Sequence, residues 1–170
     1  GGRARRHAQG IARPGAHRDE DASLRRALAR HPADPWLLSR RGRRRLAADQ
    51  AGLARDDFAA AVARRPAHRL RRIEHAGAAY RLGDPAPALA VLDEDDDMLQ
   101  QELDLLKILS WWRIGRPSLA ERRFAKLPRY GSESLPQEIV RVLSSYVPEG
   151  KRAAAHRRFR RVNCRHWNAE

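Results

Sequence analysis

The sequence predicts an all-α protein, and three observations carry the prediction. The 170 residues include 29 Ala and 19 Leu, which are both strong helix formers. Ile, Val and Thr, on which sheets depend, together number only 11. Apolar residues recur at helical spacing from about residue 19 to residue 167, and Pro or Gly interrupts them at near-regular intervals. A mostly β protein is therefore excluded.

The interruptions divide the chain into nine expected helices. Each helix except the last ends at a helix breaker or a turn residue, in the order His31-Pro32, Asp49, Arg65-Pro66, Gly83, the acidic run 93–97, Gly115, Leu127-Pro128 and Pro148-Glu149-Gly150. The expected helices span residues 21–31, 35–48, 53–64, 68–82, 86–93, 97–114, 117–126, 135–147 and 151–163.

Residues 1–18 differ in composition from the rest of the chain. They hold four Gly, five Arg and no acidic residue, and Ile11 is their only large aliphatic residue. Such a segment buries too little apolar surface to offset the entropy of ordering it. We therefore expect a disordered basic tail over residues 1–18, one helical repeat domain over residues 19–163, and a short C-terminal tail over residues 164–170.

A repeat of about 34 residues runs through the helical region. Large apolar anchors recur in every second helix at spacings of 34, 34, 32 and 35 residues: Leu24, Phe58, Leu92, Phe124 and Phe159. Four residues before the last four anchors stand small residues, namely Ala54, Ala88, Ala120 and Ala155. Five residues before those alanines stand the turn residues Asp49, Gly83, Gly115 and Gly150.

This spacing resembles the tetratricopeptide repeat over about residues 19–162. Four degenerate repeats match, after a half-repeat at residues 19–31: Gly42, Ala54, Phe58, Ala61 and Pro66; Tyr80, Ala88 and Leu92; Trp111, Gly115, Ala120 and Phe124; Tyr146, Gly150, Ala155 and Phe159. The resemblance implies an α–α superhelix, a solenoid of antiparallel helix pairs. It also implies a concave groove, lined by the first helix of each pair, that binds a peptide.

The groove positions implied by the resemblance combine Arg with exposed aromatic residues. Arg grips carboxylates with two parallel hydrogen bonds, and Trp supplies contact area, so the expected ligand carries acidic groups beside apolar ones. We expect Trp111 to pack in the core. For Trp112, packing between repeats is the alternative to partner binding. The expected partner-binding residues are Trp36, Arg40, Arg43, Arg71, His75, Trp112, Arg113, Arg116 and Arg141.

The sequence offers no recognisable catalytic or cofactor site. Ser, Cys and His do not cluster with a third partner, and no GxGxxG, Walker or HExxH motif occurs. The lone Cys164 excludes a disulfide framework. The run at residues 93–97 is expected to be a solvated acidic turn, with weak cation binding and an ion pair to the basic ends as alternatives. We expect a non-enzymatic protein-interaction scaffold or adaptor without metal or cofactor.

The charge of +14 is unevenly distributed and leaves two further functions open. Residues 1–72 carry a net +12, residues 73–104 a net −8, and residues 151–170 a net +6. Nucleic-acid binding through the basic stretches is one alternative, although a GC-rich genome would also favour the 32 Arg. A part of a larger bacterial envelope, secretion or outer-membrane protein is the other. The expected location is the cytoplasm, or the periplasm if the N-terminus is trimmed.

Overall fold

The computed structural model describes residues 14–93, 97–127 and 134–167. Within these ranges every regular element is an α-helix and no strand occurs, which confirms the all-α prediction. The helices are α1 (Pro14–Arg30), α2 (Pro35–Ala47), α3 (Ala51–Arg64), α4 (Arg69–Leu82), α5 (Ala86–Ala90), α6 (Asp97–Arg113), α7 (Pro117–Ala125), α8 (Ser134–Tyr146) and α9 (Glu149–Trp167).

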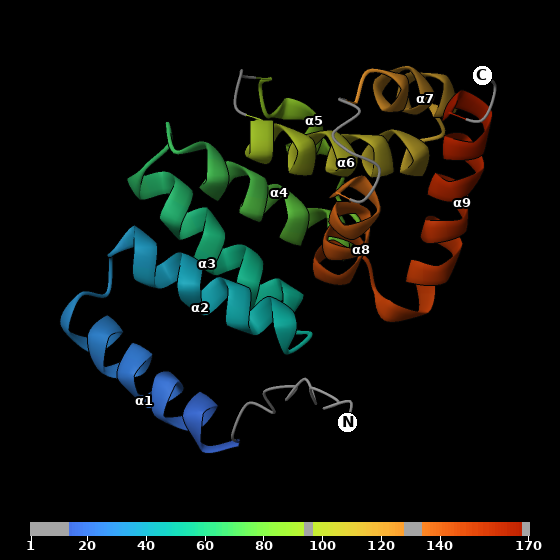
Figure 1. Ribbon diagram of the computed structural model, residues 1–170. Coiled ribbons are helices and arrows are strands. Elements are labelled where there is room, and N and C mark those ends of the chain that lie inside the picture. Colours follow the sequence, from blue (N-terminus) through green and yellow to red (C-terminus); the bar gives the residue numbers. More distant parts are fainter. Residues whose placement is uncertain (1–13, 94–96, 128–133, 168–170) are drawn as a thin grey trace, which may run out of the picture.

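The helices form an α–α superhelix that runs from α1 at one end to α9 at the other (Figure 1). Packed neighbours include α2 with α3, α4 with α5, α6 with α7 and α8 with α9, which are the expected pairs. Short connections between packed neighbours make them antiparallel. The first helices of the pairs, α2, α4, α6 and α8, also contact one another in sequence. This layer corresponds to the surface on which the groove was expected.

Helix α1 begins earlier than expected. It starts at Pro14, so residues 14–18 belong to a helix and not to the tail that composition predicted. Proline suits the first helical position because its fixed φ is already helical and its missing N–H has no partner there. Helix α9 likewise continues to Trp167, past the expected end at residue 163. The remaining tail residues, 1–13 and 168–170, lie outside the described residues.

Close helix packing depends on the small residues of the repeat. Gly42 on α2 lies directly under the ring of Phe58 on α3, and a Cβ at residue 42 would lie 2.7 Å from a ring carbon. Phe58 and its companion Ala54 are fully buried. The glycine therefore lets α2 approach α3 closely while the aromatic ring fills the space between them.

In three of the helix pairs, the first helix is followed by a turn residue with a left-handed backbone conformation. Asp49, Gly83 and Gly115 have φ values of 61°, 108° and 72°, and they follow α2, α4 and α6. The assignment of Gly150 to the equivalent turn was wrong, because that residue lies in the first turn of α9. Pro148 makes the difference, since its restricted φ leads directly into the helix that starts at Glu149.

The second repeat ends differently from its prediction. Helix α5 stops at Ala90 and Val91 is extended, so the expected anchor Leu92 is 69% exposed and Val91 is buried in its place. The carboxylate of Asp93 holds the chain here, because it accepts hydrogen bonds from Lys107 on α6 (2.8 Å) and from Arg123 on α7 (2.9 Å). The acidic turn is thus tied to the helices beside it at Asp93, while residues 94–96 lie outside the described residues.

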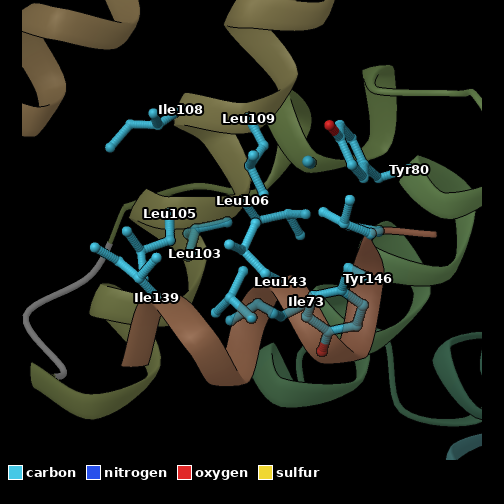
Figure 2. Close-up of a cluster of buried hydrophobic side chains, with 14 of the residues drawn as sticks. Ile73, Tyr80, Leu103, Leu105, Leu106, Ile108, Leu109, Ile139, Leu143 and Tyr146 are labelled. Atoms are coloured by element: carbon cyan, nitrogen blue, oxygen red, sulfur yellow. The ribbon is translucent and has the colours of Figure 1, made fainter. Parts of the chain in front are cut away.

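The core is centred on α6, which α4 and α8 flank (Figure 2). Leu103, Leu105, Leu106 and Ile108 of α6 are completely buried. Helix α8 also contacts α4 directly, and the ring of Tyr146 lies over Gly77. In a simple solenoid each repeat contacts only its neighbours. Here α8 also packs on α4, two helix pairs away, and this contact limits the groove on that side.

Candidate partner-binding groove

The open part of the groove is a cavity between the N-terminal halves of α2 and α4. Its volume is about 270 Å³, and we call it the α2–α4 pocket. It is lined by Trp36, Ser39, Arg40, Arg43, His68, Leu70 and Arg71. Four of the nine residues expected to bind a partner, Trp36, Arg40, Arg43 and Arg71, therefore lie together in one cavity.

Trp36 is placed at the mouth of this pocket by the start of α2. The Asp34 carboxylate caps the helix by accepting hydrogen bonds from the main-chain N–H groups of Trp36 (2.7 Å) and Leu37 (3.0 Å). The bond from Leu37 is the main reason that the pKa of Asp34 lies below its usual value. Trp36 is 57% exposed, and the guanidinium of Arg40 lies 5.3 Å from its ring centroid.

Arg71 forms the floor of the pocket. It is only 7% exposed, and it donates a hydrogen bond from Nη1 to the hydroxyl of Ser39. Its Nε is buried and has no hydrogen-bond partner within the described part of the chain. Leaving a buried donor unpaired costs about 1–3 kcal/mol, and an anion beside the Arg71 guanidinium would offset part of this cost.

The arginines around Arg71 are already paired with carboxylates. Arg40 pairs with Glu20 of α1, where both side chains are about two-fifths exposed. Arg43 pairs with Glu74 of α4, whose side chain is buried. Burial raises the pKa of Glu74 above its usual value, and the charge of Arg43 opposes this rise. An exposed pair is worth about 0–1 kcal/mol, so Arg40 can exchange partners at low cost.

A second cavity of about 470 Å³ adjoins the first, and we call it the α4–α8 pocket. Arg43 and Leu70 line both cavities. Two further arginines in its wall hold helix ends. Arg81 donates to the carbonyls of Leu46 (3.2 Å) and Ser145 (3.1 Å), and Arg152 donates to those of Val147 (2.9 Å) and Ser144 (2.8 Å). These two arginines therefore join α2, α4, α8 and α9 and serve the fold.

Arg141 lies in the wall of the α4–α8 pocket in a network of acidic groups. It donates to Glu102 of α6 (2.7 Å) and to Glu138 of its own helix (2.8 Å), which raises the pKa of Arg141. The Tyr146 hydroxyl donates to the second oxygen of Glu102 (2.5 Å). Burial raises the pKa of Tyr146, and the negative charge of Glu102 raises it further.

Four expected groove residues lie elsewhere. Trp112 lines neither cavity and packs between repeats, as the alternative held: it is 8% exposed, its ring packs edge-to-face on Phe159 at 4.7 Å, and Arg158 lies over it at 4.6 Å. Its neighbour Trp111, which was expected in the core, is partly buried and packs against the core from its edge. The register of α6 turns residue 112, and not residue 111, toward α9.

The other three residues are separated from the two pockets. Arg113 caps the C-terminus of α4 by donating to the carbonyl of Tyr80 (2.8 Å), and its guanidinium lies 5.0 Å from the Tyr80 ring centroid. Arg116 is exposed at the start of α7. His75 is half-buried, and its pKa is lowered by burial and then by the charge of Arg55 on α3. None of the three lines either cavity.

Sequence reasoning missed Arg81, Glu102 and Arg152 as pocket residues. All three reach the α4–α8 pocket because α8 packs on α4. The one sequence signal for that contact is the small residue Gly77 on a first helix, opposite an aromatic residue of a later repeat. Nothing in the spacing identifies Tyr146 as its partner.

Among the described residues, no three His, Cys, Asp or Glu side chains are grouped as a metal site would require. Over the same residues, no helix combines the length and the apolar character that crossing a bilayer demands. None of the protein-family models, curated proteins or solved structures compared with this chain matches it.

Proposed function

We propose that this protein is a non-catalytic interaction scaffold or adaptor that binds a partner segment in the α2–α4 pocket. The segment carries an acidic side chain next to an apolar or aromatic one. The observation that carries the proposal is Arg71, a buried cation in the wall of an open cavity, whose Nε has no hydrogen-bond partner among the described residues. An acidic group of the partner would bind the positively charged guanidinium of Arg71.

The two chemical requirements of the ligand follow from the pocket walls. A carboxylate would bind Arg71 and draw Arg40 away from its exposed pair with Glu20. An apolar or aromatic side chain would cover the exposed ring of Trp36, which has the size and rigidity of a binding anchor. The ligand is a chain segment because the α2–α4 pocket continues into the α4–α8 pocket along Arg43 and Leu70.

The resemblance to the tetratricopeptide repeat supports the same surface, and we propose membership of that family together with the function. The family binds peptides on the first helices of its pairs, and α2 and α4 occupy those positions here. The proposed groove is shorter than the one expected from sequence, because α8 packs on α4 and removes part of the concave face.

Fluorescence anisotropy with labelled peptides of about ten residues tests the proposal. One peptide alternates Glu with Leu and Phe, a second has Lys in place of Glu, and a third has Ser in place of Leu and Phe. Only the first is expected to bind tightly, because it alone supplies both the acidic and the apolar group. Equal binding of the first and third peptides would show that net charge alone attracts them and would contradict the pocket assignment.

A pair of variants links the binding to the pocket. Trp36→Ala is expected to lower the affinity for the first peptide about tenfold or more. A tenfold loss corresponds to about 1.4 kcal/mol of binding free energy. The matched control is Leu92→Ala, which also removes an exposed apolar side chain but lies outside both cavities. A second control, Arg116→Ala, removes a cation outside the groove and should leave affinity unchanged. Equal losses in all three variants would refute the proposal.

A further inference from the structure

Helix α9 carries an exposed row of arginines that the proposed groove does not use. The helix holds seven Lys or Arg residues and a single acidic residue, Glu149. Arg157, Arg160 and Arg161 are exposed and spaced three and four residues apart, so they share one face of the helix. We call these three residues the α9 basic stripe.

The stripe differs from the groove in its ion pairing. In the groove, Arg40, Arg43 and Arg141 each pair with a carboxylate. None of the three stripe arginines has a carboxylate partner among the described residues. Within the described residues no carboxylate therefore neutralises the charge of the stripe, and an external anion would bind it without first displacing a glutamate or aspartate there.

Among the α9 side chains that the structure describes, those bordering the stripe offer little apolar surface to a protein partner. Phe159 and Val162, the large apolar residues of α9 whose side chains are described, are buried in the core. Its exposed neighbours toward the N-terminus are Ala153 and Ala154. The core of a protein interface is enriched in apolar and aromatic residues. A surface that binds the phosphate backbone of a nucleic acid is instead polar and strongly positive.

The neighbouring helix adds to the positive charge of this end. Helix α7 packs against α9, as the two ribbons at the C-terminal end of Figure 1 show. Arg122 and Lys126 of α7 are exposed, and neither has a carboxylate partner within the described part of the chain. Exposed cations therefore lie on both of these packed helices.

We propose that the α9 basic stripe binds the phosphate backbone of a nucleic acid, without sequence specificity and at a site separate from the peptide pocket. Guanidinium groups bind phosphate oxygens with paired hydrogen bonds. Binding releases counterions from the nucleic acid, so the affinity falls steeply as salt is added. The protein thereby joins a nucleic acid at α9 to a peptide at α2 and α4.

The test is the salt dependence of binding to a fluorescein-labelled DNA duplex of about 20 mixed base pairs, between about 50 and 200 mM KCl. The triple variant R157Q/R160Q/R161Q is compared with R25Q/R26Q/R30Q. The second variant removes the same charge from exposed arginines of α1. Each phosphate contact contributes about 0.9 to the steepness with which log affinity falls against log salt concentration. The α9 triple variant loses three contacts, so its slope is expected to be less steep than that of the wild type by about three. The α1 triple variant is expected to leave the slope unchanged.

Several results would overturn the proposal. The wild-type protein could fail to bind the duplex at the lowest salt, or the two triple variants could lose affinity equally, which would show an effect of net charge. Poly-L-glutamate that competes as strongly as unlabelled duplex would indicate an acidic protein as the partner. Binding to phosphatidylserine vesicles without binding to the duplex would indicate a membrane surface. The acidic peptide serves as a folding control, since its affinity for the α9 triple variant should equal that for the wild type.

Discussion

The direct contact of α4 with α8 can be tested by adding one methyl group at Gly77. A Cβ at this position would clash with Cε1 and Cδ1 of the Tyr146 ring, well inside van der Waals contact. The ring is buried, and its hydroxyl donates a 2.5 Å hydrogen bond to Glu102. Gly77→Ala therefore has to displace the ring and strain that bond, or push α8 away from α4.

The size of the effect follows from two opposing contributions. Overpacking a buried site costs about 1–3 kcal/mol. Replacing Gly by Ala within a helix stabilises it by about 0.5–1 kcal/mol. Gly52 provides a matched control, because it lies in α3 and a Cβ there would meet nothing within 4 Å. The propensity gain at Gly77, in the middle of α4, is at least as large as that at Gly52, in the first turn of α3, so Gly77→Ala should be up to about 3 kcal/mol less stable than Gly52→Ala.

Urea denaturation followed by far-UV circular dichroism measures both free energies of unfolding. Gly52→Ala is expected to be more stable than the wild type, and Gly77→Ala less stable. Tyr146→Leu provides a further comparison, because Gly77→Ala should no longer destabilise a protein that lacks the ring. If Gly77→Ala and Gly52→Ala were equally stable, α8 would not lie on α4 as described, and the shortened groove would lose its basis.

Two further predictions concern the core and the acidic turn. Phe124→Ala removes a completely buried ring whose centroid lies 6.0 Å from that of Phe159. The substitution should lower the free energy of unfolding by about 3–5 kcal/mol. A loss below about 1 kcal/mol would show that α7 is misplaced. For Asp93, burial alone would raise the pKa, but hydrogen bonds from Lys107 and Arg123 hold it well below its usual 3.8. The stabilising contribution of the ionised Asp93 carboxylate is thus present above pH 3.8 and is lost as the pH falls further. The wild type should therefore be more stable than Asp93→Asn at about pH 7. This difference in stability should shrink below pH 3.8. A difference that does not change with pH would refute this ion pairing.

Much of the architecture could be predicted because its determinants are local. Pro and Gly mark the helix ends, and the spacing of Ala54 and Phe58 fixes which face of α3 is buried. The prediction for Leu92 failed because the end of α5 is set by Asp93, whose partners Lys107 and Arg123 lie on two other helices. A tertiary contact of this kind overrides a local pattern.

The candidate site was predicted in part, for a related physical reason. Trp36, Arg40, Arg43 and Arg71 come from two adjacent first helices, so the repeat register was sufficient to place them together. The prediction for the rest of the groove assumed that each repeat contacts only its neighbours. The packing of α8 on α4 breaks that rule, and it depends on a pairing of a glycine with a tyrosine that the repeat does not encode.

The most direct test of the central claim is a titration of the isotope-labelled protein with the Glu/Leu/Phe peptide, followed by two-dimensional NMR. The indole N–H signal of Trp36, assigned with the Trp36→Phe variant, reports on the mouth of the α2–α4 pocket. The account predicts saturable shifts at Trp36 and along the N-terminal halves of α2 and α4, with no shifts on α7 or α9. Shifts that are spread over the basic surface, or centred on α9 without Trp36, would contradict it.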